Sequence, residues 1–115
     1  MLRVTCVMVM PTEEEIEAAA RVLQATAASK PARVYLFGSY ARGEAGPHSD
    51  LDFLVVEPEV TQRRREMARL RVALPDHNAP VDVLVCSEEE ARFWEASRTH
   101  VVGVALAEGR LVASA

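Results

Sequence analysis

Two apolar runs joined by a short polar segment constrain the fold of this chain most strongly. Residues 34–37 are Val-Tyr-Leu-Phe and residues 53–56 are Phe-Leu-Val-Val, and such β-branched and aromatic runs form buried strands. The first run ends at Gly38-Ser39, and the second follows Asp50-Leu51-Asp52. We therefore predict a strand, a tight turn at Gly38, a short helix or loop, and a second strand that carries two carboxylates.

Asp50 and Asp52 are the two carboxylates of that second strand. Side chains two positions apart in a strand emerge on the same face, so these two lie side by side, whereas Leu51 and Phe53 face the other way. Neighbouring carboxylates repel each other, and a divalent cation bound by both would relieve the repulsion. The pattern indicates a metal site.

The Gly38-Ser39 turn indicates an anion site. Gly38 lets the backbone approach a ligand closely, and Ser39 offers a hydroxyl group and a backbone N–H at the start of the predicted short helix. A phosphate group fits such a place.

A third carboxylate lies in residues 81–85, Val-Asp-Val-Leu-Val, which we predict to form another strand. A buried, unpaired Asp82 would cost several kcal/mol, so a role as a further metal ligand explains it. The alternative is that Asp82 lies at the exposed end of the strand and caps the preceding turn. Both interpretations stay open from the residues alone.

Gly38-Ser39 and Asp50-Leu51-Asp52 stand ten residues apart, with Ala41-Arg42-Gly43 and Ser49 between them. This arrangement resembles the motif of the polymerase-β-type nucleotidyltransferase superfamily, and the two parts at this spacing seldom occur together by chance. The chain length and the ending Ala-Leu-Ala-Glu-Gly-Arg, residues 105–110, narrow the resemblance to minimal nucleotidyltransferases. Genes of that family often stand beside a gene for a HEPN-domain protein, as toxin–antitoxin pairs. The resemblance is strongest over residues 33–56 and extends to Arg110.

The resemblance implies a role for each candidate site residue. Asp50 and Asp52 would hold the nucleotide-bound Mg²⁺, and Asp82 would help to hold a second Mg²⁺ and activate the acceptor hydroxyl. The backbone of Gly38 and the side chain of Ser39 would grip the β- and γ-phosphates of ATP. Arg42 could contact phosphate, or it could pair with Asp52 or Glu44 and brace the turn.

The resemblance also implies an acceptor outside this chain. An antitoxin of this kind would transfer NMP, in the form of AMP from ATP, to a tyrosine of a HEPN-type toxin and form a hetero-oligomer with it. One alternative is a non-catalytic antitoxin that acts by binding its partner. Another is nucleotidyl transfer to a small molecule such as an aminoglycoside.

Size and composition fit one small domain. We expect a single domain over residues 11–115, large enough for one core, with residues 1–10 as an extension that forms an edge strand or a tail. A net charge of −4 disfavours binding to long nucleic acids.

Cys6 and Cys86 have no metal-ligand spacing, which favours reduced thiols in the cytoplasm. No apolar run reaches the length of a membrane span, and the opening residues do not resemble a signal peptide.

Helices are predicted before, between and after these strands along the chain. Thr12 with Glu15, and Ser87 with Glu90, form capping boxes at two helix starts. The first helix has the apolar stripe Ile16, Ala20, Leu23 and Ala27. A second helix spans residues 61–74, with Met67, Leu70 and Leu74 inward and its five arginines outward.

The C-terminal part is predicted as a helix with Phe93 and Trp94, a helix over 98–108 that Gly109 ends, and a short edge strand at 110–112. Trp94 and Tyr40 are interpreted as packing residues, and His77 and His100 as structural. His48 is expected in a solvated loop or lining the pocket. The element order predicts an α/β fold with a small mixed sheet packed with helices.

Overall fold

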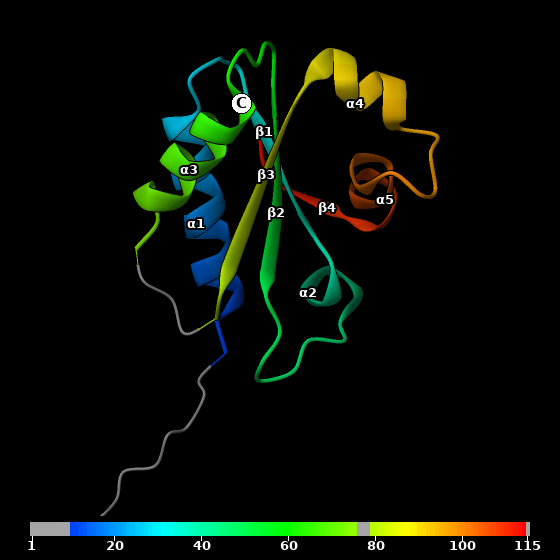
Figure 1. Ribbon diagram of the computed structural model, residues 1–115. Coiled ribbons are helices and arrows are strands. Elements are labelled where there is room, and N and C mark those ends of the chain that lie inside the picture. Colours follow the sequence, from blue (N-terminus) through cyan, green and yellow to red (C-terminus); the bar gives the residue numbers. More distant parts are fainter. Residues whose placement is uncertain (1–9, 76–78, 115) are drawn as a thin grey trace, which may run out of the picture.

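Figure 1 shows the computed structural model of the protein, which describes residues 10–75 and 79–114. Within these residues the elements follow in the order α1 (Glu13–Thr26), β1 (Arg33–Phe37), α2 (Ser39–Arg42), β2 (Leu51–Glu57), α3 (Arg63–Ala73), β3 (Val81–Ser87), α4 (Glu88–Trp94), α5 (Val101–Glu108) and β4 (Arg110–Ala113). The predictions for residues 1–9, including Cys6, and for His77 lie outside the described residues.

A mixed sheet forms the centre, with the strand order β3-β2-β1-β4. β1 runs antiparallel to both β2 and β4, whereas β2 and β3 are parallel and are connected through α3. The predicted small mixed sheet is therefore confirmed, and the residues after Gly109 form the predicted edge strand.

Helices cover both faces of the sheet, with α1 and α3 on one side and α4 and α5 on the other (Figure 1). The larger core lies under α1 and α3, where Val34, Leu36 and Phe53 pack with Leu23 and Leu70. The smaller core lies under α4 and α5; its buried members are Leu54, Val56, Cys86, Ala91, Val102 and Ala105. Because β2 is buried on both faces, its sequence is almost continuously apolar.

The two predicted capping boxes are present at the starts of α1 and α4. Thr12 Oγ1 accepts the Glu15 N–H at 3.1 Å and Glu15 returns a bond to the Thr12 N–H at 2.8 Å. Ser87 and Glu90 form the same reciprocal pair before α4. The apolar stripe of α1 is buried as predicted, as is Leu70 of α3, and the five arginines of α3 are exposed.

The predicted helix over 98–108 begins later, at Val101. His100 caps it, since its Nδ1 accepts the Val102 N–H at 3.2 Å, and its ring stacks on Trp94 with centroids 3.7 Å apart. Gly109 ends α5 as predicted, but with φ −80° rather than in the left-handed conformation. A glycine is needed there because a Cβ would lie 2.9 Å from the carbonyl oxygen of Leu36.

None of the helices over 10–75 and 79–114 is long and apolar enough to cross a membrane.

Candidate active site

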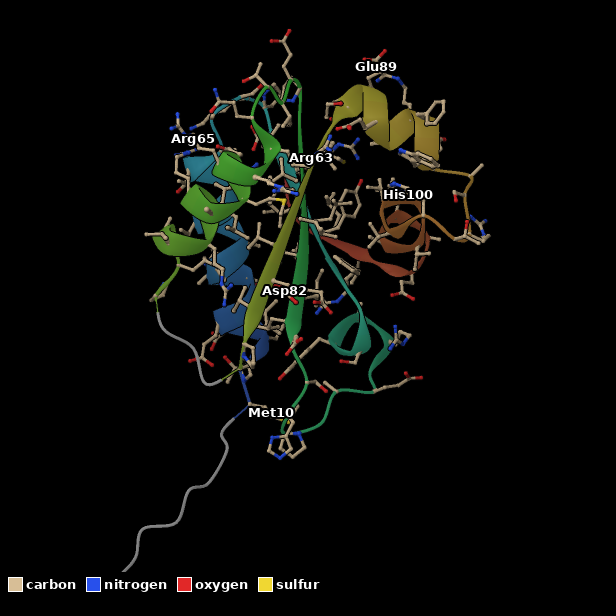
Figure 2. The ribbon with its side chains drawn as sticks, viewed as in Figure 1. Met10, Arg63, Arg65, Asp82, Glu89 and His100 are labelled. Atoms are coloured by element: carbon tan, nitrogen blue, oxygen red, sulfur yellow. The ribbon has the colours of Figure 1, made fainter. Side chains whose placement is uncertain are left out.

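Three carboxylates meet at the end of the sheet that lies beside α2. Asp50 directly precedes β2, Asp52 is the second residue of β2, and Asp82 is the second residue of β3. The parallel register sets Asp52 opposite Asp82, and one oxygen from each of the three side chains lies within 4.8 Å of the others. Figure 2 shows Asp82 in the half of β3 nearer to α2. The structure thus brings together all three predicted ligands.

Asp82 has a different environment from the one expected from its apolar neighbours. Its side chain is exposed, so a cost of burial does not explain its presence in β3. It does lie near the start of the strand, as the alternative interpretation assumed, but the register directs it toward Asp52. Its candidate role therefore rests on its distance from the other two aspartates.

The charge of this cluster has a measurable consequence for Asp52. Partial burial, followed by the nearby charges of Asp82 and Asp50, raises the pKa of Asp52 to about 6 from its ordinary value of 3.8. A bound cation would relieve the repulsion between carboxylates that are close together and partly shielded from water. Carboxylate oxygens are also the ligands that Mg²⁺ prefers, so the three aspartates fit this ion.

Gly38 is required by the approach of Asp52. It has φ +78°, where other residues are strained, and a Cβ at this position would collide with Oδ2 of Asp52. The backbone of the turn therefore lies directly against the carboxylate cluster. Ser39 is the first residue of α2, as predicted, and Gly38 is the residue that precedes it as N-cap.

Arg42 ends α2 and braces this turn. Its Nε donates to Glu44 at 2.9 Å and its Nη1 donates to Glu108 at 3.1 Å. Of the partners considered from sequence, Glu44 is observed, and Asp52 is not among the hydrogen-bond partners of Arg42 within the described residues.

Glu108 is a residue of this site that sequence reasoning missed. The same Oε1 that accepts from Arg42 also accepts the backbone N–H of Gly38 at 3.1 Å. The contact joins positions 70 apart, so no local pattern indicates it. The one available signal is its place as the last residue of α5, directly before Gly109.

Other candidate groups from the sequence are a loop histidine, a packing tyrosine and a buried cysteine. His48 is exposed in the loop before Asp50, and Tyr40 packs against the larger core as predicted. Burial raises the pKa of the Cys86 thiol to about 12, so it remains protonated at neutral pH and is a poor nucleophile.

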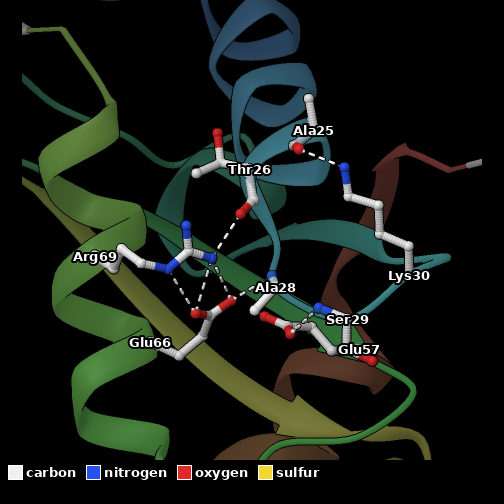
Figure 3. A network of polar contacts seen from close by, with 8 residues as sticks. All are labelled: Ala25, Thr26, Ala28, Ser29, Lys30, Glu57, Glu66 and Arg69. Atoms are coloured by element: carbon white, nitrogen blue, oxygen red, sulfur yellow. Dashed lines mark hydrogen bonds and ion pairs between the residues drawn. The ribbon is translucent and has the colours of Figure 1, made fainter.

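A buried pair of glutamates, Glu57 and Glu66, lies at the opposite end of β2 from the three aspartates (Figure 3). Sequence reasoning missed this pair as well. Glu57 accepts the Ser29 N–H at 3.1 Å, and Glu66 accepts the Ala28 N–H at 2.9 Å. Arg69 binds Glu66 and also donates to the carbonyl of Thr26. These bonds tie the end of α1 to β2 and α3, which assigns the pair a structural role.

Comparisons with known proteins agree on one family and one fold. A family model described as "Nucleotidyltransferase domain" matches residues 16–112. A chain in the crystal structure of a toxin-antitoxin with AMP-PNP is 23% identical, with a TM-score of 0.57, over 86% of this chain and 73% of that chain. The crystal structure of a protein described as "a putative nucleotidyltransferase from Sulfolobus solfataricus" is 23% identical, with a TM-score of 0.55, over 86% of this chain and 80% of that chain. No curated protein matches the chain.

Proposed function

Since the chain belongs to the nucleotidyltransferase domain family and is therefore a transferase, we propose that it moves AMP from ATP onto a hydroxyl group of a partner protein. The observation that carries this proposal is the group of three aspartate oxygens, within 4.8 Å of one another, against the Gly38-Ser39 turn. A cation site and a phosphate site then adjoin, as transfer of a nucleotide requires.

Each side chain has a part in this proposal. Asp50 and Asp52 hold the Mg²⁺ that accompanies ATP, and Asp82 completes the site for a second Mg²⁺ on its exposed side. Bound ions of this kind neutralise the phosphate charge and make the acceptor hydroxyl more acidic. Gly38, Ser39 and Arg42 hold the β- and γ-phosphates through N–H groups and a hydroxyl group.

The transfer itself is a single displacement at the α-phosphorus. The acceptor oxygen forms a bond to the α-phosphorus, the bond from that phosphorus to the bridging oxygen breaks, and pyrophosphate leaves. The hydroxyl proton passes to Asp82, whose exposed carboxylate faces the side from which an acceptor can approach. Positioning and charge neutralisation supply the catalysis.

The proposed acceptor is a tyrosine of a HEPN-type toxin, and the chain is then the antitoxin of the pair. Support comes from the fold that this chain shares with a component of a toxin-antitoxin complex with AMP-PNP. We place the reaction in the cytoplasm, where ATP and Mg²⁺ are both supplied.

Transfer of label from ATP tests the proposal. The protein is incubated with Mg²⁺ and ATP labelled on the α-phosphate, together with its co-purified partner or a lysate of its host. The wild type is compared with Asp50→Asn and with Glu89→Gln, whose glutamate lies on α4 beyond the other end of β3 from Asp82 (Figure 2). We expect label on one protein band with the wild type and Glu89→Gln, and none with Asp50→Asn.

The other outcomes separate the alternatives. Equal labelling by Asp50→Asn would contradict the assignment of the cation site. A partner that co-purifies without ever being labelled would favour an antitoxin that acts by binding alone. Label that appears in a small molecule would favour an acceptor such as an aminoglycoside.

A further inference from the structure

Glu108 binds two of the groups that the proposed function assigns to phosphate. Its Oε1 accepts the N–H of Gly38 and the Nη1 of Arg42, each at 3.1 Å. The side chain is 27% exposed, so it is partly shielded from water where it lies. One carboxylate oxygen thus collects a backbone donor and a guanidinium donor, as a phosphate oxygen would.

A phosphate group and Glu108 compete for these donors. A backbone N–H makes one good hydrogen bond at a time, and both candidate acceptors are anions. The carboxylate also adds negative charge beside Asp52, because Gly38 lies in contact distance of Asp52. With Glu108 in place, an incoming triphosphate meets occupied donors and a repelling charge.

We infer that Glu108 is a built-in competitor of the nucleotide, which occupies the phosphate donors in the free protein and leaves them when a triphosphate binds. This inference rests on the proposed function, because it concerns the same phosphate site. It adds selectivity: a ligand displaces Glu108 only if its own negative charge and contacts exceed those of the carboxylate.

The surroundings of Glu108 permit this displacement. It is the last residue of α5, and rotation of its side chain breaks no hydrogen bond of the helix backbone. Arg42 retains Glu44, which binds its Nε at 2.9 Å, so the guanidinium is not left without a partner. The Gly38 N–H passes directly from one anion to another.

Glu44 supplies a matched control. It is also a glutamate paired with Arg42, but within the described residues it has no bond to the Gly38 N–H. Glu108→Gln removes the competing charge and keeps an oxygen that can accept from Gly38, whereas Glu44→Gln removes a charge of the same sign from Arg42 only. A difference between the two variants therefore reports the negative charge that lies against the Gly38 N–H.

Calorimetric titration of the full chain with a non-hydrolysable ATP analogue and Mg²⁺ tests the inference. Glu108→Gln is expected to bind the analogue about fivefold more tightly than the wild type, as loss of one partly exposed charge contact predicts. Glu44→Gln is expected to stay within about twofold of the wild type. Equal or weaker binding by Glu108→Gln would show that Glu108 supports the turn instead, and would overturn the inference.

A measurement on the wild type covers the case in which Glu108→Gln folds poorly. The carbon-13 shift of the Glu108 carboxylate is followed by NMR while the analogue is added, together with the Gly38 amide proton. Both signals are expected to move, and an unmoved Glu108 signal at saturation would overturn the inference. If the wild type binds no analogue but Glu108→Gln does, Glu108 blocks the site without being displaced, and the inferred exchange with a triphosphate is overturned. If neither binds, the proposed function fails as well.

Discussion

At the scale of single residues, Glu57 and Glu66 form a buried acidic pair, and burial favours a proton on Glu57. Glu57 is 1% exposed, and within the described residues its Oε2 is a buried oxygen with no hydrogen-bond partner. Burial and the neighbouring Glu66 raise the pKa of Glu57 to about 7. Burial works against ionisation of Glu66 too, but its bonds from Glu57, Ala28 and Arg69 outweigh this and lower its pKa.

This pair makes stability depend on pH. The raised pKa of Glu57 means that its proton stabilises the fold below the unfolded value of 4.5, and that this contribution is lost as the pH rises through about 7. The lowered pKa of Glu66 gives stability above 4.5 that is lost as the pH falls. The stability that the pair contributes is therefore greatest near pH 4.5 and falls as the pH rises toward 7 or drops well below 4.5.

We expect Glu57→Gln to remove the alkaline loss, because the amide can donate to Glu66 at any pH. Between pH 5 and pH 8 the wild type should lose about 2 kcal/mol of unfolding free energy relative to this variant. Urea unfolding across this range measures the difference, with Glu59→Gln, an exposed neighbour, as control. Parallel curves for the wild type and Glu57→Gln would contradict the proton on Glu57.

Gly38 and Gly43 have similar values of φ but different surroundings. Both have positive φ, at +78° and +74°, but a Cβ at Gly38 collides with Asp52, whereas one at Gly43 meets nothing within 4 Å. Gly43→Ala should therefore cost about 1 kcal/mol from backbone strain alone.

Gly38→Ala should lose more stability than that, about 2–3 kcal/mol, and should lower nucleotidyl transfer about a hundredfold by displacing Asp52. Urea unfolding and the label-transfer rate measure the two effects. Equal losses of stability and of transfer rate in Gly38→Ala and Gly43→Ala would show that a Cβ at position 38 does not displace Asp52.

At the scale of elements, α4 and α5 are joined by an aromatic contact. Trp94 of α4 packs against the smaller core and stacks on His100, the cap of α5. Phe93 meets the edge of Trp94 but is 75% exposed. The packing role that the sequence predicted for Trp94 is thus confirmed, and α5 in turn places Glu108 at the candidate active site.

We expect Trp94→Ala to lower the free energy of unfolding by about 2–3 kcal/mol, through lost packing and a loosened helix cap. Phe93→Ala should cost less than about 0.5 kcal/mol because most of its side chain is already in water. Thermal and urea unfolding of the two neighbouring variants give this comparison. A larger loss for Phe93→Ala would mean that the contacts of Trp94 do not hold the two helices together.

The elements also show how far sequence could lead. Capping boxes at Thr12 and Ser87 were predictable because their partners lie three residues away. Contacts of Glu57, Glu66 and Glu108 span 28, 38 and 70 positions, so no periodicity or local motif indicates them. Asp82 falls between these cases: the strand was predictable, but its exposed side chain depends on where the sheet ends.

At the scale of the whole molecule, β2 carries carboxylates at both of its ends, and they lie on opposite faces of the sheet. Asp52 and Glu57 are five positions apart in β2, which separates them by about 17 Å along the strand and places them on opposite faces. Asp52 belongs to the candidate active site, whereas Glu57 binds the backbone that follows α1 (Figure 3). Substitutions at the two places should therefore have additive effects on stability.

Anomalous diffraction from crystals grown with Mn²⁺ and a non-hydrolysable ATP analogue tests the central claim most directly, since Mn²⁺ accepts the same oxygen ligands as Mg²⁺. We expect anomalous peaks within coordination distance of Asp50, Asp52 and Asp82, with the outer phosphates of the analogue at Gly38 and Ser39. Analogue bound in the hollow of about 220 Å³ lined by Glu57, Arg65 and Arg69, with no peak at the three aspartates, would contradict the account.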